Sequence, residues 1–156
     1  MVKTWRAFWQ LNGLERGIAL EAAAGLMASW VGLRLVRFSR WKRLMEWFTP
    51  PAGNSEESRG LELAAQARAI ARLEAGVARR IFLRTNCLEQ ALALWWVLKR
   101  QGIPGELRIG GRKEGGRFEA HAWVEFAGET LDVSGEAHLH FVPFDGPLES
   151  LETKAH

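Results

Sequence analysis

The chain has 156 residues, of which 47% are apolar and 25% are charged, and its formal net charge is +3. This length suits a single domain with a buried core, and the composition is typical of a soluble globular protein, for which we expect a cytoplasmic location. The single cysteine excludes an internal disulfide and any all-cysteine metal site within one chain, and no stretch resembles a secretory signal peptide.

The N-terminal third is basic and is predicted to be helical. Residues 1–50 carry eight Lys or Arg and three Glu, a net charge of +5, so the rest of the chain carries −2. The Ala- and Leu-rich stretch 14–38 predicts a long helix. Its longest run without charge, between Glu21 and Arg34, has 12 residues, whereas a bilayer span needs about 20. We therefore predict no transmembrane helix, and we expect 1–50 to be an N-terminal helical region that packs on the core or docks a partner.

Residues 37–48 predict a second helix that is both basic and amphipathic. Lys and Arg alternate there with four large apolar residues, Trp41, Leu44, Trp47 and Phe48. In one interpretation, such a helix lies on a membrane or on the surface of a partner. In the other, which we favour, it presents a solvated basic face over buried aromatic side chains.

The remaining residues, 51–156, are predicted to form the core of one compact domain. The segment from Pro50 to Gly60 is a linker rich in Pro, Gly and small polar residues, and it contains a capping-box spacing at Asn54 and Glu57. Two helices and three strands are predicted beyond it, at about 56–79, 86–101, 106–113, 118–126 and 129–135. Helices followed by an antiparallel sheet predict an α+β fold, and the tail 138–156 stays unassigned.

Cys87 occupies the predicted start of the helix at 86–101. Asn86 and Glu89 have the spacing of a capping box, so Cys87 falls in the first helical turn. Unpaired backbone N–H groups and the helix dipole favour negative charge there, and they stabilise the thiolate, which is the nucleophilic form. The alternative is a structural cysteine, because a free thiol packs well in a core. Glu89 and Glu125 are expected to be cap and surface residues.

A reactive cysteine needs a base, and His121 is the best placed of the four histidines. A two-residue turn at Ala127-Gly128 places Asp132 diagonally across from His121, on the same face of the sheet. An aspartate there accepts a hydrogen bond from one imidazole nitrogen, so that the other nitrogen faces the thiol. This is the nucleophile, base and orienting-group arrangement of acyl transfer. Cys87, His121 and Asp132 are therefore the predicted catalytic residues.

Simpler roles for the same residues stay open. A histidine in a strand is most often a half-buried structural residue. A metal site formed by Cys87, His121 and either Asp132 or His138 is a weaker alternative, because no close pair of ligands accompanies them. We expect no metal and no cofactor.

Several motifs together resemble a known family. Cys87 begins the pattern C-L-x-x-A-L-A-L, the sequence R-Q-G-I follows at 100–103, and His121 lies in A-H-A-W-V with the acidic Asp132 beyond it. Over 85–133 the chain resembles the transglutaminase-like cysteine peptidase of lasso-peptide biosynthesis. That enzyme is the B protein, which removes the leader from the precursor peptide.

The N-terminal pair Glu21-Ala22 and the Arg-rich stretch 33–44 also resemble this family, so the likeness covers most of the chain. The resemblance implies an α+β core of the transglutaminase-like or papain-like kind. It implies that Cys87 is the nucleophile, that His121 is the general base and then the acid, and that Asp132 orients the imidazole. The peptide bond after the leader would be hydrolysed through an acyl-enzyme, and the Cys87 backbone N–H would donate a hydrogen bond to the oxyanion.

The resemblance also suggests partners. Some members of this family carry an N-terminal leader-recognition domain, a small winged-helix-like module. The first 80 residues of this chain read instead as helices continuous with the peptidase pattern, so the chain resembles the split form, which works with a separate leader-recognition protein. We expect that protein and the precursor's leader peptide as partners, with the lasso cyclase as a further candidate. We expect no nucleic acid, and the basic N-terminal helices are candidates for weak membrane association.

Two other functions compete with leader cleavage. A transglutaminase-like site passes the acyl group to an amine instead of water in some enzymes, which would make this chain a crosslinking or amidating acyltransferase. The other hypothesis is non-enzymatic. In it, the chain is a helical, basic adaptor or membrane-surface module whose cysteine only packs.

Overall fold

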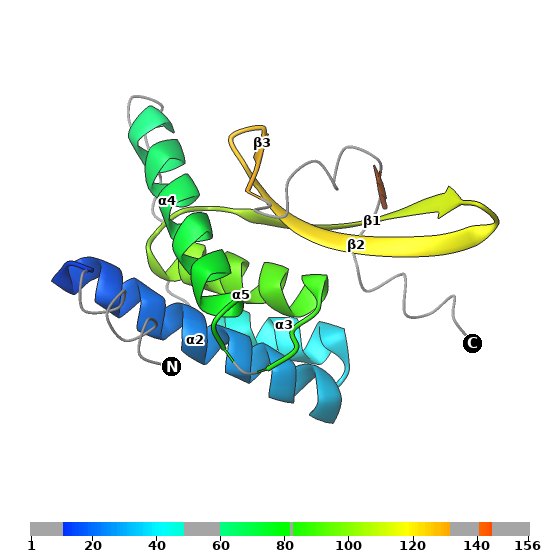
Figure 1. The fold of residues 1–156 in the computed structure, drawn as a ribbon, viewed down its shortest axis with the longest axis horizontal. Helices are drawn as coiled ribbons and strands as arrows, with labels where there is room; N and C mark the ends of the chain where they lie inside the picture. Colours follow the sequence, from blue (N-terminus) through cyan, green and yellow to red (C-terminus); the bar gives the residue numbers. More distant parts are fainter. Residues whose placement is uncertain (1–10, 49–59, 82, 132–140, 145–156) are drawn as a thin grey trace.

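The computed structural model describes residues 11–48, 60–81, 83–131 and 141–144 (Figure 1). Within these residues the chain forms four helices and a four-stranded antiparallel sheet with the strand order β3-β2-β1-β4. The elements are α2 (Gly13–Leu35), α3 (Phe38–Trp47), α4 (Gly60–Ala78), α5 (Cys87–Arg100), β1 (Glu106–Glu114), β2 (Arg117–Phe126), β3 (Glu129–Thr130) and β4 (Val142–Pro143). The predicted α+β class is confirmed.

Side-chain caps explain where two of the predicted helices begin. α2 starts after Asn12, whose side chain accepts a hydrogen bond from the Glu15 N–H, while the Glu15 carboxylate accepts one from the Asn12 N–H. α5 begins with the same box at Asn86 and Glu89, as their spacing predicted. It ends shortly before Gly102, whose φ of +75° is one that glycine adopts without strain.

The other helix predictions are also confirmed. The long N-terminal helix corresponds to α2, the basic helix to α3, and the helix at about 56–79 to α4. α2 and α3 are separate helices because Val36 and Arg37 adopt extended backbone conformations between them. The segment 49–59, with most of the linker and the expected capping box at Asn54 and Glu57, lies outside the described residues.

The hairpin between β2 and β3 has the predicted register. Its turn is formed by Ala127-Gly128, and Phe126 pairs with Glu129 across it. Both turn residues have positive φ, as in the turns that match the twist of a two-residue hairpin. Asp132 and most of the predicted strand 129–135 lie beyond the described part of the sheet, so the placement of Asp132 beside His121 stays a prediction.

The turn residue Ala127 carries backbone strain that a mutation can relieve. Its φ of 51° lies in the left-handed region, which costs a residue with a Cβ about 1–2 kcal/mol. Ala127→Gly removes this cost and adds a smaller entropic one, so we expect the free energy of unfolding to rise by about 0.5 kcal/mol. Equilibrium urea denaturation measures the change. Gly128→Ala, at a φ of 77°, is the opposite control and should destabilise the protein; a stabilising effect there would contradict the account.

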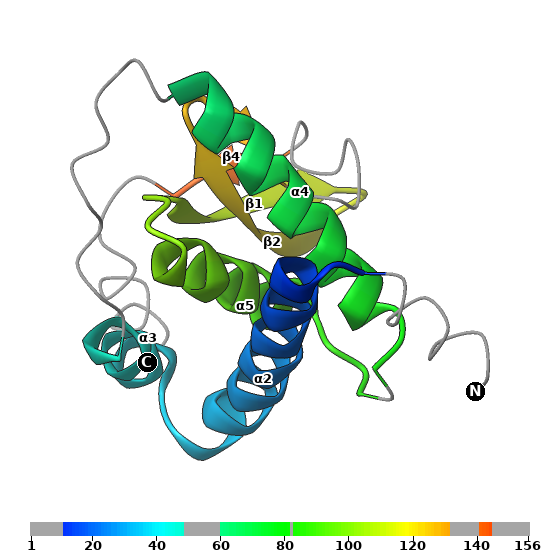
Figure 2. The same ribbon diagram turned by 90° about the vertical axis from the view of Figure 1, so that its left-hand side faces the viewer.

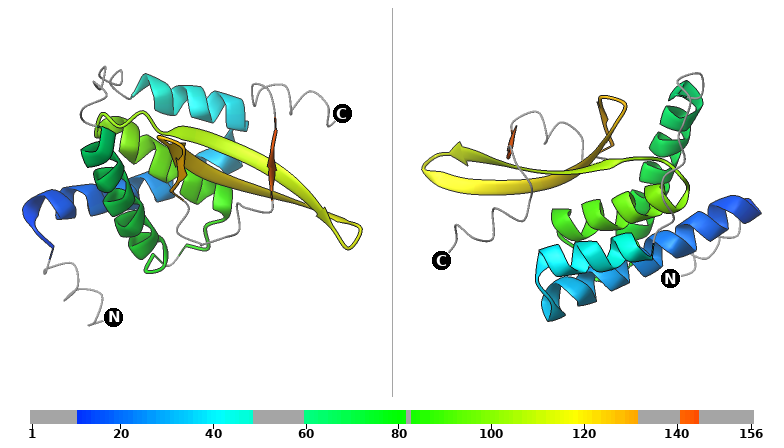
Figure 3. Two further views of the ribbon diagram at one scale, coloured as in Figure 1. Left: turned by 90° about the horizontal axis from the view of Figure 1, so that it is seen from above. Right: turned by 180° about the vertical axis from the view of Figure 1, so that it is seen from behind.

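The helices and the sheet form layers around α5. α5 lies between the sheet and the pair α2 and α3 (Figure 3). α4 packs against both α2 and α5 (Figure 2), and the β1–β2 hairpin extends beyond the helices (Figure 1). The central position of α5 fits its sequence, because a helix that is apolar on most of its surface is buried on most sides. Its buried apolar residues are Ala91, Leu92, Ala93, Leu94, Trp95, Val97 and Leu98.

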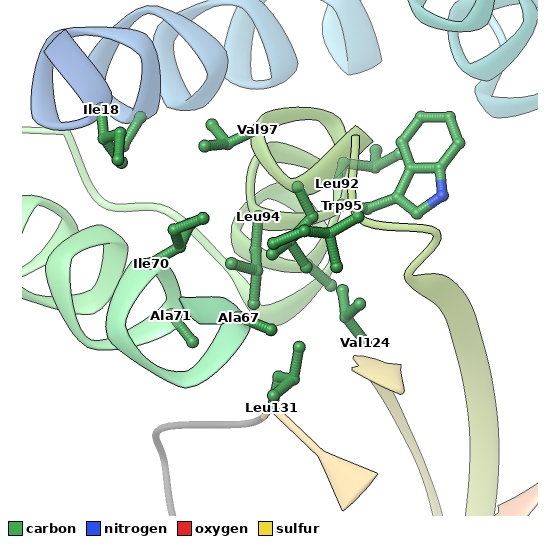
Figure 4. Packing of buried hydrophobic residues seen from close by; sticks show 14 of the residues in the cluster. Ile18, Ala67, Ile70, Ala71, Leu92, Leu94, Trp95, Val97, Val124 and Leu131 are labelled. Carbon is green, nitrogen blue, oxygen red and sulfur yellow. The ribbon is translucent and has the colours of Figure 1, made fainter. Parts of the chain in front are cut away.

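One hydrophobic cluster connects the N-terminal region with the sheet (Figure 4). Ile18 of α2, Ile70 of α4, Leu92 of α5 and Val124 of β2 all belong to it. Each such side chain contributes about 1.5–3 kcal/mol when it is removed from water. Val124 faces this cluster whereas Trp123 is buried outside it, in agreement with the predicted alternation along β2.

The favoured interpretation of residues 37–48, a basic face over buried aromatic side chains, is wrong for two of the aromatic residues. Trp47 is 78% exposed and Phe48 is 62% exposed. Trp41 is half-buried beneath Gly32 of α2, where an added Cβ would lie 2.2 Å from the indole ring. Gly32 therefore permits the close approach of α2 and α3, and the fully buried residue of α3 is Met45.

α2 is long and apolar enough to cross a membrane, judged by length and composition alone, and its mean hydropathy over the best window is 1.4. It is the one helix of this kind in the described part of the chain. In the fold, 39% of that window is buried, and α2 packs on α4 and α5. The core helix of a soluble protein has the same properties, so this feature is weak support for a membrane span.

A fourth strand, β4, comes from the tail that the sequence left unassigned. Val142 and Pro143 pair with Gly111 and Gly110 of β1. Gly110 permits this approach, because an added Cβ would lie 2.6 Å from the Val142 carbonyl oxygen. Two residues are too few to show an alternating pattern, so pairing with β1 alone defines this strand.

Candidate functional site

A cavity of about 370 Å³ lies where α4 and β2 meet the first half of α5. Its lining residues are Glu74, Ala75, Ala78, Arg79, Cys87, Gln90, Ala91, Leu94, His121, Ala122, Trp123, Val124 and Leu131. Cys87 and His121, two of the three predicted catalytic residues, are therefore brought to one cavity. The third, Asp132, lies outside the described residues, and its role stays a prediction.

Cys87 is the first residue of α5, where the capping box holds it. The Asn86 side-chain oxygen accepts a hydrogen bond of 2.9 Å from the Glu89 N–H, and the Glu89 carboxylate accepts one of 2.8 Å from the Asn86 N–H. The backbone N–H at this first position has no partner within the helix. The thiol is free and half-buried, and it lines the cavity instead of filling the core.

The cap residue Glu89 has a second role that its spacing did not reveal. It is 2% exposed, and its Oε1 accepts a hydrogen bond of 2.7 Å from Arg34 Nη1. Its Oε2 accepts the bond from the Asn86 N–H. One buried carboxylate therefore ties the end of α2 to the first turn of α5, which carries Cys87.

Arg34→Ala is expected to lower the free energy of unfolding by about 2 kcal/mol, because it leaves the buried Glu89 carboxylate without its cationic partner. The loss is moderate because the Arg34 side chain is 48% exposed and water screens its charge. The control is Arg68→Ala, which breaks an ion pair with Glu129 in which both side chains are exposed, at an expected cost below about 1 kcal/mol. Thermal and urea denaturation measure both changes. Equal losses in the two variants would contradict the assigned role of Arg34.

His121 is held on β2 by aromatic contacts. Its ring stacks with that of Trp123, with centroids 6.0 Å apart and an interplanar angle of 18°, and it lies 5.2 Å from the ring of Phe141. Trp123 Nε1 donates a hydrogen bond of 2.8 Å to Glu125 Oε1, so Glu125, expected at the surface, is half-buried and supports this arrangement. Phe141 directly precedes β4. The strand that was not predicted therefore positions one of the two rings beside the imidazole.

Glu74 lines the same cavity and was not predicted as a site residue. It is 3% exposed, and its Oε1 has no hydrogen-bond partner among the residues that the structure describes. Burial raises the pKa of the Glu74 carboxyl to about 8, and the nearby Arg79 opposes this rise. The sequence did contain a signal, because Glu74 continues the helical spacing of the buried residues Ala67 and Ile70 on α4.

The part of the chain that the structure describes contains no group of three His, Cys, Asp or Glu residues able to hold a metal ion. Cys87 and His121 supply two ligands at most, fewer than the three protein ligands of a catalytic zinc site. Asp132 and His138, which the alternative metal site requires, lie outside the described residues. That alternative stays a prediction.

Comparison with known proteins gives one family. A family model described as the Transglutaminase-like superfamily matches residues 32–144, which is more than two thirds of the chain. The match begins within α2 and includes α3, α4, α5, the whole sheet and the cavity. Neither the curated proteins nor the solved structures gave a match.

Proposed function

The chain belongs to the transglutaminase-like superfamily, and on that premise we propose that it is a cysteine peptidase that removes the leader from a lasso-peptide precursor. A transglutaminase-like domain suggests cysteine peptidase or acyltransferase-type activity. The observation that supports catalysis most directly is that Cys87, in the first turn of α5, and His121, on β2, line one cavity. The substrate class is supported by the motif resemblance over 85–133.

In the proposed first step, His121 takes the proton from the Cys87 thiol, and the thiolate attacks the carbonyl carbon of the leader's last residue. The Cys87 backbone N–H donates a hydrogen bond to the resulting oxyanion. His121 then gives its proton to the departing amine of the core peptide as the C–N bond breaks. The leader remains bound to Cys87 as a thioester.

In the proposed second step, His121 takes a proton from a water molecule, which attacks the thioester carbonyl. The C–S bond breaks, and the leader leaves with a new carboxylate. Asp132 is proposed to stabilise the imidazolium in both steps by a hydrogen bond to its other nitrogen. The rings of Trp123 and Phe141 pack against the imidazole, which lines the cavity, and support its position there.

We propose that a separate leader-recognition protein presents the leader to this chain. Four exposed large apolar side chains share one face of α2 by their helical spacing and support a docking surface there. They are Leu20, Met27, Val31 and Leu35. The lasso cyclase is a further candidate for the same surface, and the basic residues of α3 lie next along the chain.

The test uses the full chain, a candidate precursor peptide and a candidate leader-recognition protein from the same organism, incubated in water enriched in oxygen-18. Hydrolysis through an acyl-enzyme gives two peptides, and one heavy oxygen enters the new carboxylate of the leader. The core peptide carries no label. Intact precursor after incubation with both partners would overturn the proposal.

The acyltransferase alternative is tested in the same assay with an added primary amine. The transglutaminase-like match fits this alternative as well as it fits a peptidase. A leader carrying the amine in place of the new carboxylate would identify an amine as the acceptor, and a hydrolysed leader alone would identify water. The non-enzymatic alternative predicts neither product, and sedimentation of the full chain with liposomes tests its membrane-surface form.

A further inference from the structure

We propose that Glu74 determines substrate specificity by binding a neutral, hydrogen-bonding side chain of the substrate, a carboxamide or a hydroxyl, beside the reactive thiol. This inference rests on the proposed function, because it takes the cavity that contains Cys87 and His121 to be the peptide-binding site. It assigns a recognition role to a residue that takes no part in the proposed chemical steps.

The placement of Glu74 suggests a ligand. Its carboxyl group is buried, its side chain lines the cavity, and its Oε1 has no hydrogen-bond partner among the described residues. Buried polar atoms are nearly always hydrogen-bonded, because an unpaired one loses its interactions with water and gains nothing in return. Because the Glu74 side chain lines the cavity, a ligand that enters the cavity can supply the hydrogen-bond partner that the described residues do not.

The charge state of Glu74 selects the class of ligand. The pKa of this carboxyl is about 8, raised by burial, so the group is mostly protonated at pH 7. A protonated carboxyl both donates and accepts hydrogen bonds, as carboxamides and hydroxyls also do. A cationic side chain would need the ionised form, and Arg79, which lines the same cavity, would repel it.

The test measures how fast Cys87 is labelled by peptide vinyl sulfones, in which the thiolate adds to the vinyl carbon and a proton from solvent completes the thioether. The probes differ in one side chain, which is glutamine, serine, norleucine or lysine, varied first at the residue next to the vinyl group and then at the one before it. Mass spectrometry of the intact protein gives the labelling rates. Wild type is compared with Glu74→Gln, which keeps a donor and an acceptor, and with Glu74→Met, which has the length but not the polarity.

Wild type should react with the glutamine or serine probe about tenfold faster than with the norleucine probe, at one of the two positions. Glu74→Gln should keep this preference, and Glu74→Met should lose it. The relative rates of the glutamine and serine probes then distinguish a carboxamide site from a hydroxyl site.

A preference for lysine in wild type that Glu74→Gln abolishes would overturn the inference in favour of a cation site. Equal rates in wild type and Glu74→Met would overturn it in favour of a structural role. The absence of labelling by any probe would overturn the proposed function, and this inference with it.

A pH series provides an independent readout. The ratio of the glutamine rate to the norleucine rate cancels any pH dependence of the thiol addition itself, which is common to both probes. Arg79, the cationic side chain that lines the same cavity, stays charged throughout. In wild type this ratio should fall as the pH rises through about 8, because Glu74 then loses the proton that it donates. In Glu74→Gln the ratio should not change with pH. A ratio that is independent of pH in wild type would contradict the donor role.

Discussion

Cys87→Ala is expected to abolish precursor cleavage, with a loss of at least about 10⁴-fold in kcat, while the protein still folds. The loss is large because in the proposed mechanism the thiolate forms the covalent bond to the leader, and no other side chain in the described part of the cavity is a comparable nucleophile. The fold should survive because the thiol is half-buried at a helix start, and the capping hydrogen bonds come from its neighbours Asn86 and Glu89.

The measurement is precursor cleavage followed by mass spectrometry, with equilibrium denaturation of the same preparation. The free energy of unfolding should change by no more than about 1 kcal/mol. Lys113→Ala is the matched control, because this exposed residue pairs with Phe118 near the end of the β1–β2 hairpin and does not line the cavity. Cys87→Ala protein that still cleaves the precursor would overturn the catalytic role of this residue.

His121→Ala is expected to lower kcat/KM for cleavage by about 10²–10⁴-fold, which is the usual contribution of a general base. The same change should slow the alkylation of Cys87 by iodoacetamide near neutral pH, because the variant lacks the side chain that is proposed to accept the thiol proton. This second measurement needs no substrate and no partner protein. It therefore tests whether the two residues already act together in the isolated chain.

A control separates the chemistry of His121 from its packing. Phe141→Leu removes one of the two rings beside the imidazole and keeps the imidazole itself. We expect this variant to lose less than about tenfold in cleavage and to keep the alkylation rate within a similar factor. If Phe141→Leu and His121→Ala lose activity equally, the ring contacts matter and the base does not, and the proposed role of His121 fails.

The sequence was informative wherever short-range geometry decides the structure. Asn86 and Glu89 are three residues apart, and this spacing alone places both groups of a capping box at a helix start and puts Cys87 in the first turn. The turn at Ala127-Gly128 likewise determined which residues of β2 and β3 are paired, because a two-residue hairpin leaves one register. Alternation along β2 correctly separated His121 and Trp123 from the core-facing residues.

The sequence was less informative where a residue's role depends on what packs against it. Trp47 and Phe48 have the spacing of buried residues, yet no described element covers them. The role of Asp132 follows from the register and from the resemblance, and it stays a prediction because the described residues end one position before it. Composition and spacing describe one helix or strand at a time, whereas the burial of a side chain also depends on which other element packs against it.

The sequence by itself determined the helices and the hairpin register, and it indicated Cys87 and His121 as candidate catalytic residues. It could do so because caps, turns and strand alternation are properties of neighbouring residues. Only the tertiary structure decided that these two residues share a cavity and that Arg34 neutralises the buried Glu89. It also decided that the buried Glu74 Oε1 has no hydrogen-bond partner within the described part of the chain. Those features join α2, α4, α5 and β2, which lie far apart in the chain. Burial between elements sets the free energy of each feature, because it removes water from the side chains. The local sequence of one element does not specify which other element covers it.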